Sequence, residues 1–357
     1  MLIKTDCRLY KGDIPCKPHK ELGVHCEDCN YYKKTSINVL IIKLGAIGDV
    51  IRTTPLLRKL RVVYPDANIY WLTYSPEILS TDWVDNIVKV NPENLEIIKA
   101  IHFDWLINLD KDKIAIALTK TIESDKKSGF TMDRFGNAQP ISNKAEEHKW
   151  ITGIFNDISK QNTKHYVQEI FEICEFIFND EEYILDIKEE AHNWEIDKSK
   201  KVIGLNTGCG GRWISRLWPN DYWVELAKGL INDGFEVVFL GGELEHEKNL
   251  LLSKTSGGKY FGHFSLEKFI LLMNECDLIV TAVTMAMHIA VGLKKKLVLF
   301  NNIFNKNEFY LYGRGEIIEP EFECDCYYSP VCPNDCMKNI YPKTVINSLS
   351  KIISEIS

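Results

Sequence analysis

The feature that most constrains the fold is an alternation of short apolar runs with amphipathic segments. The run INVLIIKL at 37–44 is almost continuously apolar and rich in β-branched residues, which is typical of a strand buried on both faces. Apolar residues at helical spacing follow at 50–65, and short apolar runs return at 67–74, 87–91 and 104–110. Strands that alternate with helices favour a parallel sheet with helices on both faces.

A second series of the same kind begins near residue 201, after a stretch at 142–200 whose helical pattern predicts a bridge. Strands are expected at 201–206, 236–242, 277–283 and 296–302, and helices at 221–233, 245–254, 266–275, 284–293 and 344–356. Because 357 residues exceed the roughly 250–300 that one core supports, we expect two doubly wound Rossmann-like α/β domains. The expected boundaries are a Cys-rich extension at 1–35, a first domain at 36–195 and a second at 196–357.

Composition excludes several classes of protein. Hydrophobic residues make up 45% and charged residues 26%, which argues against a disordered, collagen-like or coiled-coil chain. The formal net charge of −7 argues against a nucleic-acid partner. We see no signal-peptide pattern at the start and no apolar run of 18 residues, so a cytoplasmic location is expected.

The first loop that could carry chemistry follows the strand at 37–44. Gly45 and Gly48 let a ligand approach the backbone, and the helix that follows offers its N–H groups to an anion. The spacing matches neither a dinucleotide-binding fingerprint nor a P-loop. Asp49 fits two roles, a helix cap or a general base.

The second loop, at 206–219, combines glycines, a hydroxyl and arginines directly after a strand. Glycines expose backbone N–H groups and guanidinium groups suit phosphate oxygens, so Thr207, Gly208, Arg212 and Arg216 predict a pyrophosphate site. A flexible loop with solvated arginines is the alternative.

Two further strand ends carry polar residues. Thr284 and His288 follow the strand at 277–283, although a lone histidine among Ala and Met is more often an interior residue. Glu245 follows the strand at 236–242, where it favours the dipole of the next helix or accepts from ribose hydroxyls.

Taken in this order, the loops resemble glycosyltransferase family 9, the ADP-heptose heptosyltransferases, over about residues 37–350. The segment INVLIIKLGAIGDVIRTTPLLRKL is similar to the family's first strand, GD loop and TPLL helix, and RLWPNDYWVELA is similar to its Lys-x-Trp-Pro segment. The string from Cys324 to Val345 resembles its C-terminal cysteine pattern.

The resemblance implies a GT-B fold, with the active site between two Rossmann-like domains. It implies inverting, metal-independent transfer of a heptose-like sugar from an ADP donor to a hydroxyl, with Asp49 as the base. Donor contacts are implied for Gly45, Gly48, Thr207, Gly208, Arg212, Arg216, Glu245, Thr284 and His288. Arg216 stands where the family has lysine, and Val283 and Met285 stand where it has Asp and Gly, which leaves the identity of the sugar open.

Eight of the eleven cysteines form two groups of four. The groups are Cys7, Cys16, Cys26 and Cys29, and Cys324, Cys326, Cys332 and Cys336. In a reducing compartment such groups hold zinc or iron more often than they form disulfides, so a structural metal is expected, in one shared or two separate sites. No cofactor is expected for catalysis.

The expected function is therefore glycosyl transfer onto a glycan, lipid-linked or protein acceptor. Basic residues on the first helix, Arg52, Arg58, Lys59 and Arg61, suit an anionic acceptor or peripheral contact with a membrane. The alternatives are a metal-thiolate or redox-sensing protein on the same scaffold and a nucleotide-sugar 2-epimerase. The oligomeric state is left open.

Overall fold

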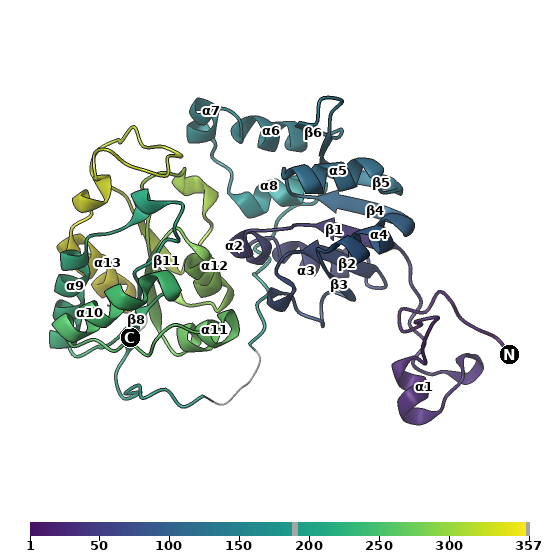
Figure 1. Cartoon of the computed structure of the whole chain (residues 1–357), viewed down its shortest axis with the longest axis horizontal. Helices are drawn as coiled ribbons and strands as arrows, with labels where there is room; N and C mark the ends of the chain where they lie inside the picture. The colour runs from purple at the N-terminus through teal and green to yellow at the C-terminus, as the bar shows by residue number, and fades with distance from the viewer. Residues whose placement is uncertain (188–191, 355–357) are drawn as a thin grey trace. The chain divides into compact units, whose positions relative to one another are not determined.

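The computed structural model describes residues 1–187 and 192–354, and they form two compact units, each built around one sheet (Figure 1). The first unit holds Met1–Ala46, Thr53–Trp150 and Gln168–Glu181. The second holds Ile47–Arg52, Ile151–Val167 and the described chain from Glu182 onward. Two short segments from the first half of the sequence thus belong to the second unit.

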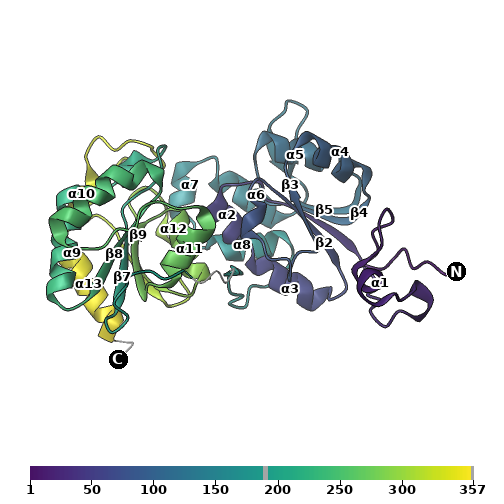
Figure 2. The same ribbon diagram turned by 60° about the horizontal axis from the view of Figure 1, so that its bottom comes forward.

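The first unit is a sheet in the order β3-β2-β1-β4-β5-β6, parallel except for the last pair. Its strands are β1 (Asn38–Ile42), β2 (Asn68–Thr73), β3 (Asn86–Lys89), β4 (Phe103–Asn108), β5 (Ser124–Met132) and β6 (Ala138–Pro140). Its connecting helices are α3 (Pro55–Val63), α4 (Pro92–Ala100) and α5 (Lys113–Thr121). Alternate residues of β1, such as Leu40 and Ile42, pack under α4 and α5, while α3 lies on the opposite face (Figure 2).

Between residues 144 and 173 the chain passes from the first unit to the second and back. This stretch forms three helices, α6 (Lys144–Thr152), α7 (Asn156–Gln161) and α8 (Tyr166–Ile173). In the described part of 174–201 no further helix follows, and 188–191 of the expected bridge lie outside the described residues. At the amino end, residues 1–36 form an extension whose elements are α1 (Lys17–Leu22) and the 3₁₀ turn η1 (Cys26–Asp28).

The second unit is a parallel sheet in the order β11-β10-β9-β7-β8. Its strands are β7 (Val202–Asn206), β8 (Glu236–Leu240), β9 (Leu278–Ala282), β10 (Lys296–Phe300) and β11 (Gly315–Ile318). Its helices are α2 (Ile47–Ile51), α9 (Asn220–Asn232), α10 (His246–Ser256), α11 (Leu266–Asn274), α12 (Met285–Gly292) and α13 (Pro342–Ser354). Figure 2 shows α9, α10 and α13 on one face of this sheet and α11 and α12 on the other.

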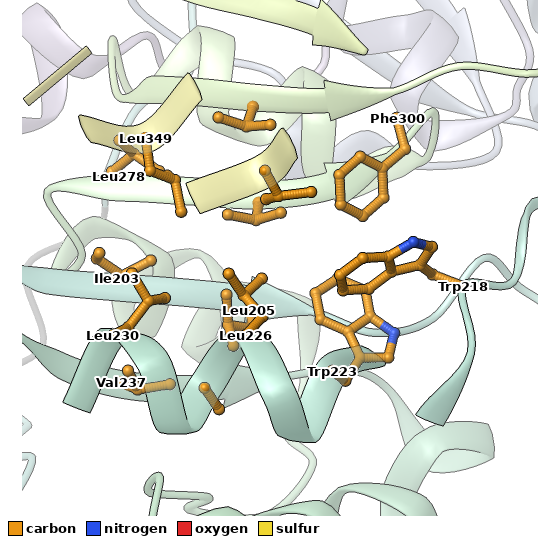
Figure 3. Packing of buried hydrophobic residues seen from close by; sticks show 14 of the residues in the cluster. Ile203, Leu205, Trp218, Trp223, Leu226, Leu230, Val237, Leu278, Phe300 and Leu349 are labelled. Carbon is orange, nitrogen blue, oxygen red and sulfur yellow. The ribbon is translucent and has the colours of Figure 1, made fainter. Parts of the chain in front are cut away.

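The core of the second unit lies between its sheet and the helices α9 and α13. Trp218, Trp223 and Phe300 pack edge to face and tilted at one end of this layer, with ring centroids 4.7–5.8 Å apart (Figure 3). Aliphatic side chains such as Leu226 and Leu349 fill the rest. Burial of this apolar surface fixes the sheet against its helices, and so fixes the loops at the strand ends.

The expected fold class, two doubly wound α/β domains, is confirmed. Two helices of the first unit, α4 and α5, and three strands, β5, β6 and β11, were not predicted. The expected helix at 50–65 is divided into α2 and α3, and residues 355–356 of the expected last helix lie outside the described residues. No helix in the described part of the chain has the length and apolar character needed to cross a membrane.

Candidate active site

The sheet of the second unit has its topological switch point between β7 and β9. From β7 the chain continues outward to β8 on one side, and β9 and β10 lie on the other, so the loops at the carboxyl ends of β7 and β9 diverge. A crevice at this position is where open α/β sheets bind their ligands. The loops that leave β7, β8 and β9 carry Thr207, Glu245 and Thr284, which the sequence analysis singled out separately.

Asn206, at the end of β7, holds two of these loops together. Its Nδ2 donates to the carbonyl of Gly208 at 3.2 Å and to Oγ1 of Thr281 at 2.9 Å, and lies 3.5 Å from Oγ1 of Thr284. Thr284 in turn caps α12, because its hydroxyl accepts from the N–H of Ala286 at 3.2 Å. We call the loop at 206–219, which leaves β7, the glycine loop. The amino end of α12 therefore faces the same strand ends as this loop.

Glu245 closes against the glycine loop. A Cβ built on Gly208 would lie 2.3 Å from Cδ of Glu245, so only glycine fits beside this carboxylate. Oε2 of Glu245 accepts from the N–H of Gly242 at 3.0 Å, which fixes the side chain while leaving its other oxygen beside Gly208. A carboxylate held at a strand end in this way is placed to accept from the hydroxyls of a ribose.

Two cations lie at the same loop. The buried guanidinium of Arg216 donates to the carbonyls of Cys209, at 2.9 Å, and Val283, so it joins the β7 and β9 loops. Nζ of Lys248 donates to the carbonyl of Thr207 at 2.8 Å. Burial lowers the pKa of both groups, and Glu245 opposes that shift at Lys248. The loop therefore carries buried positive charge that an anionic ligand would compensate.

Asp49 lies on α2 and belongs to the second unit. Its Oδ1 lies 2.7 Å from Nη2 of Arg52, whose Nη1 lies 2.7 Å from Oε1 of Glu308. Burial opposes the charge of Arg52, but Asp49 and Glu308 together outweigh it and raise the pKa of the guanidinium above its ordinary value. Arg52 also lies 3.7 Å above the ring of Tyr166. The carboxylate of Asp49 thus has a fixed orientation and remains 32% exposed.

His288 packs against the same helix. A Cβ on Gly48 would lie 2.6 Å from Cδ2 of His288, so Gly48 is the position that allows α2 to approach α12. Burial, with a further contribution from the charge of Arg52, lowers the pKa of His288 to about 3, so the ring is neutral. Its Nδ1 and the Nε of Arg216 are buried without a hydrogen-bond partner among the described residues. Buried polar groups of this kind are ones that a ligand or water usually satisfies.

Other predicted residues have different neighbours. Arg212 is exposed and stacks over Trp213 at 5.0 Å, as a solvated arginine would. Gly45 belongs to the first unit, where it follows β1 near Tyr74. Of the basic residues on the first helices, Arg61 is engaged by Asp85 and by backbone carbonyls, and Arg58 stacks over Trp83. These arginines do not form an open basic patch.

Sequence reasoning missed several residues of the site. Lys248 follows Glu245 by three positions on the first turn of α10, a spacing that could have signalled it. Asn249 accepts from the hydroxyl of Thr207 at 2.6 Å and is fully buried. Glu308 is 256 residues from Arg52, and no local pattern could have indicated it.

The four C-terminal cysteines converge in one buried group within the second unit. All four Sγ atoms lie within 4.8 Å of one another, and the pairs Cys324–Cys332 and Cys326–Cys336 are at 3.5 Å. The Nδ2 of Asn302 donates to Sγ of Cys336 at 3.2 Å, the kind of outer contact that supports metal-bound thiolates. The donor set fits a tetrahedral metal such as zinc or iron.

The sequence of the chain is similar to those of known proteins. Residues 98–303 match the family described as glycosyltransferase family 9 (heptosyltransferase). Lipopolysaccharide heptosyltransferase 2 of Salmonella typhimurium is 34% identical over 115 residues, which are 30% of this chain and 32% of that protein. The match therefore spans about a third of the length of this curated relative.

Solved structures share the fold over most of the chain. A family 9 glycosyltransferase from Veillonella parvula has a TM-score of 0.68 at 18% identity, covering 90% of this chain and 98% of that one. The E. coli ADP-heptose lipopolysaccharide heptosyltransferase II has a TM-score of 0.64 at 17% identity, covering 90% and 100%. The iron-containing dodecameric glycosyltransferase TibC from enterotoxigenic E. coli has a TM-score of 0.57 at 11% identity, covering 91% and 78%.

Proposed function

Because the chain belongs to glycosyltransferase family 9, we propose that it transfers a heptose-like sugar from an ADP donor to a hydroxyl of a lipopolysaccharide-type glycan. The observation that carries the proposal is the collection of Thr207, Gly208, Glu245, Thr284 and two cations at the switch point of the second sheet. A nucleotide diphosphate offers the ribose hydroxyls and phosphate oxygens that these groups suit.

The donor half of the reaction falls to the second unit. Glu245 accepts from the ribose, while backbone N–H groups of the glycine loop and the amino end of α12 receive the diphosphate. Lys248 and Arg216 place positive charge near the leaving group, which gains negative charge as the glycosidic bond breaks. Arg216 acts by holding the β7 and β9 loops together, since both of its Nη groups donate to backbone carbonyls.

Asp49 is proposed as the general base. The acceptor hydroxyl must lose its proton as its oxygen attacks the anomeric carbon, and the bond to the leaving nucleotide diphosphate breaks on the opposite side, which inverts the configuration. A carboxylate that is fixed by Arg52 yet partly exposed can take that proton. The cationic and backbone donors of the glycine loop stabilise the leaving group without requiring a metal in the chemical step.

The sugar of the donor is the least constrained part of the proposal. The carbonyl of Val283 accepts from Arg216, and Met285 begins α12. The side chains of both residues are apolar, so neither offers a polar group to a sugar. A heptose presents several hydroxyls, and this chain would bind them with fewer side-chain contacts at these two positions. We therefore expect broader tolerance at the sugar than at the ADP.

A structural metal at the C-terminal cysteines would hold the glycine loop in position. Trp213 packs against this cysteine group, and Ser215 binds the cysteine loop through its N–H, to Pro330 at 3.0 Å, and its hydroxyl, to Ser329 at 2.7 Å. These contacts lie next to Arg216 in sequence. The ion would therefore be structural, and TibC, which is similar in fold, is described as iron-containing.

The experiment is a comparison of nucleotide sugars with the full chain. ADP-heptose, UDP-glucose and GDP-mannose would be offered with a truncated lipopolysaccharide acceptor, and release of the nucleoside diphosphate would be measured. Release with the ADP donor, and a loss of about 10²–10⁴-fold in kcat for Asp49→Asn with unchanged ADP binding, would support the proposal.

The alternatives give different outcomes in the same experiment. A metal-thiolate or redox protein on this scaffold would bind none of the nucleotides. An epimerase would convert the sugar without an acceptor. If Asp49→Asn releases nucleotide as fast as the unchanged chain, the assignment of the base is wrong.

A further inference from the structure

The amino-terminal extension, residues 1–36, has almost no apolar interior. Pro18 is its single buried residue, although the extension contains a helix, a 3₁₀ turn and a bridge that pairs Cys7 with Lys34. Tyr32 donates to Asp6 at 2.7 Å, but both groups are exposed. A peptide of this length with so little burial does not hold a fold by the hydrophobic effect alone.

What the extension does have is a small cavity of about 30 Å³ onto which all four of its cysteines open. The bridge and the N–H of Thr35, which donates to Asp6 at 2.8 Å, bring Cys7 back to the end of the extension. Cys16 immediately precedes α1, while Cys26 begins η1 and Cys29 follows it. Thiols from three parts of the extension thus line one space.

The size of this cavity suits one ion. A cavity of about 30 Å³ has room for an occupant the size of a water molecule or a metal ion. Among the described residues, the C-terminal cysteines are the one group of three or more ligands within 4.8 Å, so the amino-terminal thiols are more widely spaced. Four thiolates around zinc would be roughly 3.8 Å apart, given a Zn–S distance of about 2.3 Å. Binding one zinc ion would therefore draw the four amino-terminal thiols closer together.

We propose that Cys7, Cys16, Cys26 and Cys29 bind one zinc ion as a second metal site, separate from the C-terminal cysteines. Each group of four is complete within its own unit, so neither needs a ligand from the other. Binding releases the thiol protons to solvent and involves no change in oxidation state. The inference is independent of the proposed transferase activity.

The charges near the cavity favour this site. A zinc ion with four thiolates carries two net negative charges, which nearby cations stabilise. Lys4 lines the cavity, and Lys34 lies opposite Cys7 in the bridge. Because apolar burial contributes little here, the free energy of metal binding would supply most of the stability of the extension.

The test is the metal content of the full chain, purified with zinc available and measured by elemental analysis with a thiol count. Two equivalents of metal per chain are expected if the C-terminal group is also filled. The variant Cys7→Ser/Cys26→Ser/Cys29→Ser should lose one equivalent, while the control Cys276→Ser, which removes a thiol outside both groups, should lose none. If the triple variant holds as much metal as the unchanged chain, the site is refuted.

A second measurement on the unchanged chain avoids dependence on how the variant folds. Trypsin would be added before and after treatment with a chelator, and the fragments identified by mass. We expect rapid cleavage at the exposed Lys11 and Lys20 only after metal removal. Equal cleavage in both states, or a thiol count showing that the four cysteines are oxidised to disulfides, would overturn the proposal. Nucleotide release, measured in parallel, reports separately on the transferase activity.

Discussion

Asp49 and Glu308 share one cation: Oδ1 of Asp49 and Oε1 of Glu308 each lie 2.7 Å from a different nitrogen of Arg52. Arg52 is only 14% exposed and stacks on Tyr166, so its position is fixed from three sides. Because Arg52 also pairs with Glu308, its single positive charge does not fully neutralise Asp49. A carboxylate in this position is oriented and can still accept a proton.

Glu308→Gln should therefore make Asp49 a weaker base without changing the glycine loop that binds the donor. With one carboxylate removed, Arg52 pairs with Asp49 alone, and the stronger pairing makes that carboxylate less basic. We expect kcat to fall about tenfold, with the acidic limb of the pH–rate profile moved to lower pH and KM for the donor unchanged. Glu321→Gln, at an exposed position of the same unit, is the control. An unchanged pH profile would contradict this role for Glu308.

The contact between Gly208 and Glu245 can be tested by adding one methyl group. In Gly208→Ala the new Cβ would lie 2.3 Å from Cδ of Glu245 and must displace that carboxylate. We expect the Kd for ADP, measured by calorimetry, to rise about tenfold or more. In Gly211→Ala, in the same loop, the nearest atom is 3.8 Å away, so binding should change little. Equal effects of the two variants would mean that Glu245 does not contact the nucleotide.

The buried His288 predicts a dependence of stability on pH. Its pKa is lowered to about 3 in the folded chain, against 6.5 when exposed, so below pH 6.5 the unfolded chain binds the additional proton. Stability is therefore lost as the pH falls, by about 2 kcal/mol between pH 6.5 and pH 5. In urea titrations at both pH values, the unfolding free energy of the unchanged chain minus that of His288→Gln should be smaller at pH 5 than at pH 6.5 by that amount. Parallel pH profiles would refute the assignment.

Glu146 organises the turn between β6 and α6 in the first unit. Its fully buried carboxylate accepts from the N–H groups of Gly129, Ile141, Ser142 and Asn143 at 2.6–3.0 Å. Glu146→Gln places an amide NH₂ among these donors and should lower the unfolding free energy by about 3 kcal/mol. Glu147→Gln, the exposed neighbour, should change it by less than about 0.5 kcal/mol. Similar urea midpoints for both variants would show that Glu146 is not structural.

Much of the fold could be predicted because its strands are apolar on both faces. The run at 37–44 and the glycine loop after β7 gave correct positions for β1 and β7. The helical pattern predicted within 142–200 ends early, since α8, its last helix among the described residues, stops at Ile173. Glu175 has a φ of 60° and the N–H of Phe176 donates to the carbonyl of Phe171 at 2.8 Å, which ends a helix in a left-handed turn. Phe176 then packs on Trp105, a tertiary contact that local spacing does not encode.

The candidate site divides in the same way. Thr207, Gly208, Glu245 and Thr284 follow strands directly, so their convergence follows from parallel topology. Glu308 and Asn249 belong to the site through contacts with Arg52 and Thr207, which are distant in sequence. A single sequence does not show such contacts. Arg212 is exposed and stacks over Trp213, and a loop arginine looks the same in sequence whether it is engaged or solvated, so its donor contact stays a prediction.

The assignment of Ile47–Arg52 to the second unit has a consequence for dividing the chain. A fragment that begins after residue 195 would contain Glu245, Arg216 and His288 but would leave Asp49 and Arg52 behind. It would also expose the surface of α12 that Gly48 covers. Such a fragment can at most retain affinity for the nucleotide. To keep Asp49, the second unit would need α2 joined to it again, for example by a circular permutation whose new termini lie outside Ile47–Arg52.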